Sequence, residues 1–218
     1  MYCPNHFRED RLEALHGFIA RHPLATLVTS VDARPDANHV PVLLDRARGT
    51  FGALRGHVAR ANPVWRTIAD NSEVLVLFHG ADAYVSPSSY PSKRTDGRVV
   101  PTWNYAVVHA RGHIRWIHHH DRLHEVVRTL TDEHEAARDA PWAVTDAPAS
   151  YIDGMLKAIV GFEIELTELE GKIKASQNKS DIDRAGVRTA LHDTHDPEAV
   201  DELVRAPAPC GPLRTEGS

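Results

Sequence analysis

The chain has 218 residues, of which 42% are hydrophobic and 25% are charged, which is the composition of one globular domain with appendages. Its formal net charge of −5 disfavours binding to a phosphate backbone, because no segregated basic segment is visible in the sequence. A polar N-terminus, the lack of an apolar run long enough to cross a bilayer, and only two cysteines, Cys3 and Cys210, predict a cytoplasmic protein without a membrane span.

The first third of the chain predicts one helix followed by an antiparallel meander. Apolar residues at helical spacing indicate an amphipathic helix over 10–21. Residues 24–31 are rich in β-branched side chains and predict a strand, and 33–36 contain a proline turn. A second strand is expected over 38–44, and a third strand ends at Val58.

The middle of the chain predicts a short helix, more strands and a surface loop. An Asn-Pro pair favours a helix over 62–70. The continuous apolar run at 74–78 predicts a strand covered on both faces, and 84–87 continues in extended form. Residues 88–97 are polar and predict a surface loop.

The remaining elements alternate in the same way. They are a long β segment over 103–117 bent at Gly112, an amphipathic helix after a turn at 118–121, a short helix over 149–156, a last strand over 158–169, and helices over 180–191 and 197–205. About six antiparallel strands with peripheral helices pack most simply as a six-stranded β-barrel. We expect this domain to span residues 1–192, followed by a polar, partly disordered tail over 193–218.

Several common catalytic signatures are missing from the sequence. There is no phosphate-binding Gly-rich loop, no dinucleotide fingerprint and no serine nucleophile elbow. Two His-Glu pairs, at 124–125 and 134–135, begin like a zinc-protease helix, but Arg128 and Arg138 stand where the second histidine is required. A metalloprotease is therefore excluded.

Segment 56–63 ends a predicted strand and begins a predicted helix, with Arg60 at the junction. The guanidinium and the free backbone N–H groups of a helix start would suit a phosphate. On this motif alone, a surface arginine beside a capped helix explains the pattern equally well. His57 faces the other side of the strand from Val58, where it contacts a ring, ligates iron or forms a hydrogen bond in the core.

Two further segments carry polar and aromatic groups where plain barrel wall is expected. They are Asn38-His39-Val40-Pro41 and Pro101-Thr102-Trp103-Asn104-Tyr105. A flavin offers partners for both kinds of group, because its ring edge forms hydrogen bonds and its faces stack on Trp or Tyr. The alternative is a polar network within the barrel and a core tryptophan.

Blocks spread over residues 1–191 together resemble one family. These blocks are Met1-Tyr2, Pro4, His6-Phe7, Pro23 to Thr29, Asn38 to Asp45, Gly56 to Pro63, Asp82 to Pro87, Tyr90 to Lys93, Pro101 to His109, Ala158 to Gly161, and Ser176-Gln177-Asn178. In this order they resemble the PaiB-type proteins, the FMN-binding negative transcriptional regulators. One departure is Ser89, where the family often has Trp.

The resemblance implies an FMN-binding split barrel that forms a homodimer, with Arg60 on the FMN phosphate. The cofactor-binding residues that it implies are Asn38, His39, Val40, His57, Ala59, Arg60, Lys93, Thr102, Trp103, Asn104 and Gln177. The piperazate synthases share a similar framework and use haem, and in that alternative His57 or His39 is the candidate iron ligand.

Three functional hypotheses follow: a flavin-binding protein with a regulatory role, a flavin- or haem-dependent enzyme acting on a small molecule, and a barrel that works only through protein contacts. Residues 121–138 carry more acidic than basic side chains, so direct DNA binding is disfavoured and regulation is expected to be indirect. For an enzyme, His57, His39 and Tyr105 are the candidate proton donors.

Overall fold

The computed structural model describes residues 1–193, 200, 201 and 203, which form two compact units. We call His16–Phe78 with His109–Leu169 the barrel unit, and Met1–Leu15 with His79–Val108 and Glu170–Ser218 the terminal unit. Cys210 and the predicted tail beyond residue 203 lie outside the described residues. Of the helix expected over 197–205, only residues 200, 201 and 203 are described, and these are helical.

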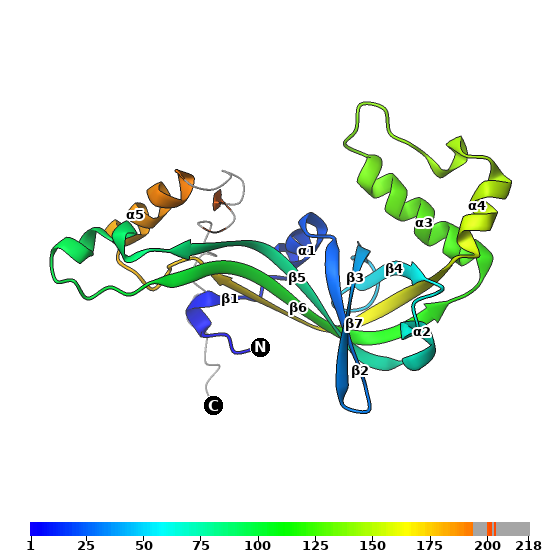
Figure 1. The fold of residues 1–218 in the computed structure, drawn as a ribbon, viewed down its shortest axis with the longest axis horizontal. Coiled ribbons are helices and arrows are strands. Elements are labelled where there is room, and N and C mark those ends of the chain that lie inside the picture. The colour runs from blue at the N-terminus through cyan, green and yellow to red at the C-terminus, as the bar shows by residue number, and fades with distance from the viewer. Residues whose placement is uncertain (194–199, 202, 204–218) are drawn as a thin grey trace, which may run out of the picture. The chain divides into compact units, whose positions relative to one another are not determined.

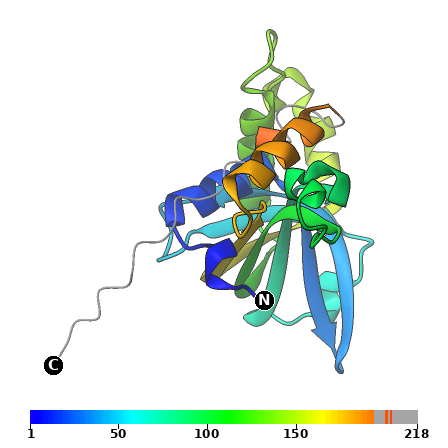
Figure 2. The same ribbon diagram turned by 90° about the vertical axis from the view of Figure 1, so that its left-hand side faces the viewer.

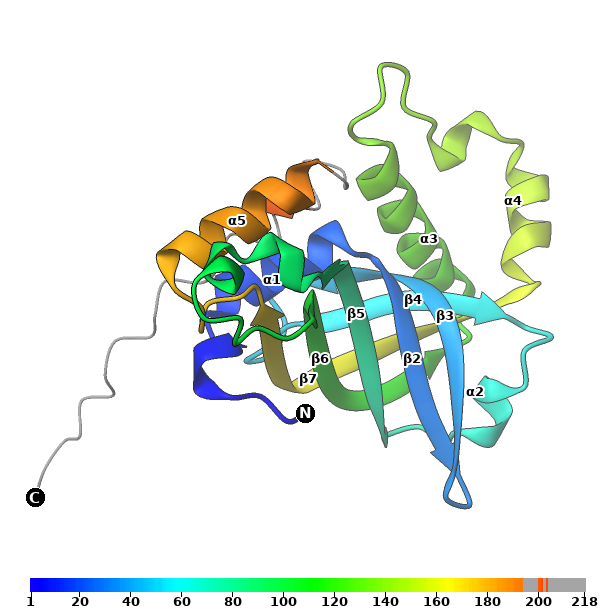
Figure 3. The ribbon, with the colours of Figure 1, turned by 60° about the vertical axis from the view of Figure 1, so that its left-hand side comes forward.

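The sheet closes on itself through antiparallel neighbours. The strands are β2 (Leu24–Val31), β3 (Arg34–Asp45), β4 (Ala53–Ala59), β5 (Ser72–Val85), β6 (Thr102–Ile117) and β7 (Ile159–Lys174). Their order is β7-β4-β3-β2-β5-β6, and a further pairing between β6 and β7 completes a ring of six strands (Figure 3). A two-residue strand, β1 (Arg8–Glu9), pairs with the end of β7. This closed order agrees with the expected six-stranded antiparallel architecture.

The turn between β2 and β3 differs from the sequence-based prediction. It lies at Asp32 and Ala33, whose φ angles are +49° and +60°, and not over 33–36. Two consecutive positive φ angles match the two-residue hairpin turn whose twist suits the flanking strands. Pro35 therefore lies inside β3, which begins four residues earlier than the predicted strand at residue 38.

The barrel unit buries the alternate side chains of its strands. In β2, Ala25, Leu27 and Thr29 are buried, while the alternate residues Leu24, Thr26, Val28 and Ser30 are half-exposed or exposed. A Cβ on Gly56 would lie 2.6 Å from the Phe162 ring and 2.8 Å from the Pro41 carbonyl oxygen. Only glycine at position 56 therefore allows β4 to lie this close to the Phe162 ring of β7 and the Pro41 backbone of β3.

Helices complete the barrel unit. α2 (Val64–Thr67) follows β4, while α3 (His120–Glu135) and α4 (Ala149–Leu156) follow β6 and contact one another (Figure 1). The sequence predicts an apolar stripe on α3 formed by Leu123, Val126, Val127 and Leu130. The helix buries Leu123, Val126 and Leu130, whereas Val127 is half-buried. The helix α1 (Leu12–Arg21) precedes the first hairpin, and its last six residues belong to this unit.

In the terminal unit, α5 (Asp181–His192) packs against the two short 3₁₀ helices Pro87–Ser89 and Pro91–Arg94 (Figure 2). The Asp183 carboxylate accepts hydrogen bonds from the backbone N–H of Ser92 at 3.1 Å and from its hydroxyl at 2.9 Å. A small core lies alongside, formed by Ala83, Val85, Tyr90, Val187, Leu191, Val200 and Leu203. The first part of the predicted surface loop at 88–97 is thus fixed to a helix.

Candidate functional site

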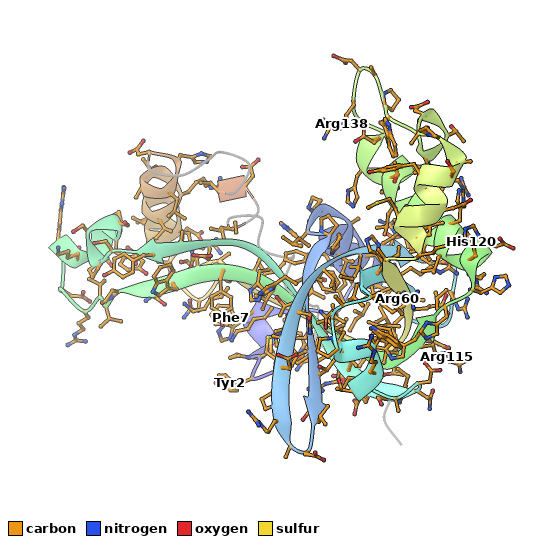
Figure 4. The ribbon with its side chains drawn as sticks, turned by 45° about the vertical axis from the view of Figure 1, so that its right-hand side comes forward. Tyr2, Phe7, Arg60, Arg115, His120 and Arg138 are labelled. Atoms are coloured by element: carbon orange, nitrogen blue, oxygen red, sulfur yellow. The ribbon has the colours of Figure 1, made fainter. Side chains whose placement is uncertain are left out.

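Arg60 lies at the corner between β4 and α2, as the sequence predicts (Figure 4). Its Nε donates a hydrogen bond to the Lys157 carbonyl oxygen and its Nη2 to the Ile159 carbonyl oxygen, each at 2.7 Å. The Arg60 backbone N–H donates to the Ala158 carbonyl oxygen, also at 2.7 Å. One side of the guanidinium therefore ties the start of β7 to the end of β4.

Two backbone N–H groups at this corner already donate hydrogen bonds to other atoms of the chain. The Asn62 N–H donates to the Ala59 carbonyl oxygen at 2.9 Å, and the Val64 N–H donates to the Asn62 Oδ1 at 3.0 Å. The Asn62 Nδ2 in turn donates to the Asn38 Oδ1 at 2.6 Å. A phosphate here would thus be held mainly by side-chain cations, and less by the helix start than the sequence indicates.

Trp65 gathers cationic and ionisable groups around its ring. The Arg66 guanidinium carbon lies 4.5 Å from the ring centroid and that of Arg60 lies 5.9 Å away. The His118 imidazole contacts the same ring at 5.4 Å, and the indole N–H donates to the Arg60 carbonyl oxygen at 3.0 Å. We call Arg60, Trp65, Arg66 and His118 the Trp65 corner. Within the described part of the chain, none of its three basic side chains forms an ion pair with a carboxylate.

His57 lies on the face of β4 that α3 covers. It is paired in register with Gly161, and a Cβ on Gly161 would lie 2.9 Å from the Leu123 side chain of α3. Opposed residues of an antiparallel pair project to the same face, so His57 lies under the helix as well. Its Nδ1 is buried and forms no hydrogen bond with a described residue, and burial lowers the pKa of the imidazole. His57 is therefore half-buried, and its lowered pKa favours the neutral imidazole.

His39 has a more open position. Its side chain is exposed on β3, and its Nδ1 lies 3.1 Å from the Thr26 hydroxyl on β2. Val40, the next residue, is buried toward the barrel interior, as strand alternation requires. Ala59 is exposed at the end of β4. Among the predicted residues of the barrel unit, His39 thus has the imidazole best placed to meet a ligand on the outer face of the sheet.

The other predicted residues belong to the terminal unit. Asn104 is fully buried, its Oδ1 accepts a hydrogen bond from the Ser176 hydroxyl at 3.1 Å, and its Nδ2 has no described partner. Trp103 is 53% exposed, and Tyr105 is half-buried with its ring 5.3 Å from the Lys172 ammonium. Thr102 accepts a hydrogen bond from the Lys174 ammonium.

Gln177 and Lys93 have local partners. The Gln177 side chain accepts from the Ala175 N–H at 2.7 Å and donates to the Ile173 carbonyl oxygen, so it closes the turn after β7. The Lys93 ammonium donates to the Ser88 hydroxyl at 3.3 Å. The predicted site residues are thus divided between the two units, with those from Asn38 to Arg60 in one and those from Lys93 to Gln177 in the other.

Sequence reasoning missed several of the side chains that the structure gathers. Arg66 and His118 of the Trp65 corner were not singled out, although Arg66 is adjacent to Trp65 in the sequence. Lys172 and Lys174 were also missed; their alternation in a β strand was the available signal, because it places both ammonium groups on one face.

Other ligand sites are sparse in the described part of the chain. It contains no cluster of three or more His, Cys, Asp or Glu residues that could hold a metal ion. No helix there is long and apolar enough to span a membrane. A hollow of about 350 Å³, lined by residues that include Ile19, Val42, Leu44 and His134, contains none of the predicted site residues.

Comparison with known proteins identifies the family. The family model described as "Putative FMN-binding domain" matches residues 1–168. The chain belongs to this FMN-binding domain family. The Bacillus subtilis protein named protease synthase and sporulation protein PAI 2 is 32% identical to this chain over 199 residues, which cover 91% of this chain and 93% of that protein. An uncharacterized protein of Emericella nidulans is 33% identical and covers 86% of this chain and 88% of its own length. The expected PaiB-type relationship is confirmed.

Solved structures support the fold of this FMN-binding domain. The structure of an FAD and haem binding protein from Mycobacterium smegmatis matches with a TM-score of 0.58 at 18% identity, over 82% of this chain and 78% of that chain. A flavocytochrome from Azotobacter vinelandii matches with a TM-score of 0.55 at 14% identity, over 83% and 75%. At these identities the likeness concerns the fold, and it confirms the expected split-barrel class.

Proposed function

We propose that this protein binds FMN with its phosphate at the Trp65 corner, and that it acts as a homodimer in redox chemistry or in indirect regulation of transcription. The observation that carries the proposal is the set of basic groups around Trp65 without a described carboxylate partner. Guanidinium groups held in place by an indole are well suited to a phosphate, since little side-chain entropy is lost on binding. Membership of the FMN-binding domain family supplies the identity of the phosphate's carrier.

The residues present fit FMN in charge. Arg60 keeps its guanidinium beside Trp65 while two of its nitrogens hold backbone carbonyls, and Arg66 stacks on the same ring. When bound, FMN would supply two-electron redox chemistry. The chain would hold the phosphate and shield the ring, and His39 and Tyr105 remain candidate proton donors for a small substrate. His57 is less suited to donate a proton, because its burial favours the neutral imidazole.

A homodimer is supported by the outer face of β2 and β5. Leu24 on β2 is 68% exposed, and Val28, Leu75 and Leu77 on the same face are half-exposed. An apolar sheet face left open to water favours coverage by a second copy. We expect multi-angle light scattering of the purified protein to give twice the chain mass of 24.2 kDa.

The indirect character of any regulation is supported by α3. Arg122 pairs with Glu125 at 3.8 Å, Arg128 with Asp132 at 3.0 Å, and Arg138, just beyond the helix end, with Glu135 at 3.1 Å. A DNA-reading helix needs basic side chains that are free to meet phosphates and bases. The basic side chains named here are matched by acids of the same segment.

Haem remains the alternative cofactor, as two structural neighbours carry haem or cytochrome in their names. A haem iron needs an imidazole nitrogen that faces an open surface. The exposed His39 meets this requirement better than His57 under α3. An intense Soret band after addition of haemin, lost in His39→Ala, would favour haem over FMN.

The test of the FMN proposal is a titration of the full chain with FMN, followed by flavin fluorescence. Arg66→Gln should weaken binding about tenfold or more, because a charge-assisted hydrogen bond contributes roughly 1.5–3 kcal/mol. Arg122→Gln is the matched control, since it removes an exposed arginine of the same unit outside the Trp65 corner. Equal FMN affinity in Arg66→Gln and the wild type, or no uptake of FMN by the wild type, would refute the assignment.

A further inference from the structure

The hollow of about 350 Å³ lies within the barrel unit and apart from every predicted site residue. Its walls come from the last turn of α1, the C-terminal half of β3 and the last turn of α3 (Figure 3). This volume is near the lower end of the range of small-molecule sites. It equals the share of about a dozen water molecules in the liquid, which leaves room for a ligand of roughly a dozen non-hydrogen atoms.

The inner wall of the hollow is apolar. Ile19 of α1 and Val42 of β3 line it and are otherwise buried, and Leu43 and Leu44 line it while half-buried. The Pro23 carbonyl oxygen accepts a hydrogen bond from the Val42 N–H at 2.9 Å, which fixes the segment after α1 against β3. A wall of this kind favours the hydrocarbon part of a ligand, because both surfaces leave water on contact.

The rim of the hollow carries charges of both signs. Arg46, the first residue after β3, lies on one side, and Glu133 and His134 of α3 lie on another, all three exposed. Within the part of the chain that the structure describes, Arg46 and Glu133 form no ion pair with each other or with another side chain. Arg128 and Asp132 of the same helix do pair, at 3.0 Å. Two opposite charges that line one hollow without pairing leave a gap that a ligand with both charges can bridge.

The direction of α3 decides which end of such a ligand lies on which side. Glu133 and His134 are in the last turn of this 16-residue helix, where the partial negative charge of the helix end favours a cation. A ligand ammonium therefore suits the Glu133 side. The Arg46 guanidinium has the planar donor geometry that suits a carboxylate. The His134 ring can donate a hydrogen bond to the carboxylate or accept one from the ammonium.

We propose that this hollow binds a free amino acid with an apolar side chain. The side chain of the ligand lies against Ile19 and Val42, its carboxylate receives the Arg46 guanidinium, and its ammonium contacts Glu133. A fatty acid or an alkylamine would satisfy only one of the two charges. None of the candidate proton donors lines the hollow, so the amino acid is an effector and not a substrate of flavin chemistry. The site does not require FMN to bind at the Trp65 corner.

The experiment titrates the isotope-labelled full chain with L-phenylalanine, whose size matches the hollow, and follows the backbone amide resonances by NMR. Saturable shifts are expected at Ala20, Leu43 and Glu133, with a dissociation constant on the order of 1 mM for so small a ligand. Phenylpropanoate lacks the ammonium and phenethylamine lacks the carboxylate, so each should bind about tenfold more weakly. Free glycine, which has no apolar side chain, should cause no shifts at these residues.

Each charged residue is tested against the analogue that lacks its partner. Arg46→Gln should weaken binding of L-phenylalanine about tenfold and leave that of phenethylamine unchanged, whereas Glu133→Gln should weaken L-phenylalanine and leave phenylpropanoate unchanged. Arg122→Gln and Glu125→Gln are the matched controls, since they remove exposed charges of α3 outside the hollow. Ala20→Phe fills the hollow from an exposed position and should abolish binding of all three compounds, and circular dichroism of each variant shows that the fold is retained.

The proposal is overturned if L-phenylalanine at about ten times the expected dissociation constant shifts no resonance of the hollow, or shifts only resonances elsewhere. Equal affinity of L-phenylalanine for the wild type, Arg46→Gln and Glu133→Gln also overturns it, because the charges then play no part in recognition. FMN affinity should be the same in Arg46→Gln and the wild type. Loss of FMN binding in Arg66→Gln, with binding of L-phenylalanine retained, bears on the Trp65 corner alone, so the two assignments fail independently.

Discussion

Arg60→Met separates the structural part of Arg60 from any part in phosphate binding. The change removes two hydrogen bonds of 2.7 Å, to the carbonyl oxygens of Lys157 and Ile159, and keeps an unbranched apolar stem beside Trp65. A hydrogen bond from a charged donor contributes roughly 1.5–3 kcal/mol when buried, and less at a half-exposed side chain such as this one. We therefore expect a loss of about 2 kcal/mol in the free energy of unfolding.

The assay is urea unfolding of the cofactor-free chain, monitored by tryptophan fluorescence. In thermal unfolding of a chain of this size, the same loss of about 2 kcal/mol corresponds to a decrease in Tm of roughly 4–8 °C. Arg60→Lys should lose about half as much, since one ammonium can reach one of the two carbonyls. An unfolding free energy within about 0.5 kcal/mol of the wild type in Arg60→Met would refute a stabilising contact between β4 and the start of β7.

Three further predictions follow from the packing. Burial lowers the pKa of His57, so as the pH falls below about 6.5 the unfolded chain binds a proton that the folded chain does not. Because this lowers the stability of the wild type in acid, His57→Phe should lose less unfolding free energy between pH 7 and 5. An unchanged dependence of the unfolding free energy on pH, measured by urea unfolding, would contradict this. Gly56→Ala should destabilise the protein by about 1–3 kcal/mol, because its Cβ would lie 2.8 Å from the Pro41 carbonyl oxygen. Gly154→Ala is the control: the space around its Cβ is open, so it should be neutral or stabilise α4 by up to about 1 kcal/mol. Gly186→Ala should loosen the contact of α5 with the 3₁₀ segment, because its Cβ would lie 2.3 Å from the Ser89 carbonyl oxygen; faster amide hydrogen exchange in α5 is the readout, and unchanged exchange would rule the contact out as a constraint.

The sequence predicted the bounds of those helices and strands whose ends are set by nearby residues. The strand at 24–31 and the helix at 149–156 are observed with the same bounds, because β-branched residues specify the first and a proline begins the second. The helix predicted over 62–70 is only Val64–Thr67. Ile68 leaves the helix because its side chain is buried and its carbonyl oxygen accepts the Trp116 indole N–H at 2.8 Å, a contact between distant segments that no local pattern shows.

In the candidate site, too, local features were predictable from the sequence and contacts between distant segments were not. The position of Arg60 at a strand-to-helix corner was predictable, since strand pattern, asparagine and proline mark it in one short segment. Its hydrogen bonds to Lys157 and Ile159 were not, because the partners are backbone carbonyls that carry no sequence signal. His118 likewise reaches Trp65 only because β6 ends beside α2. The roles of the predicted site residues remain predictions that the titrations above test.

The blocks that carry the family resemblance have a physical relation in the terminal unit. The N-terminal block contributes Tyr2, whose carbonyl oxygen binds Lys172, and the block at 101–105 contributes Thr102 and Trp103, which bind Lys174. Neither lysine belongs to a block, yet both connect blocks that are far apart in the sequence. The blocks at the N-terminus and at 101–105 therefore lie near one another along β7, because the two lysines that bind them are two residues apart on that strand.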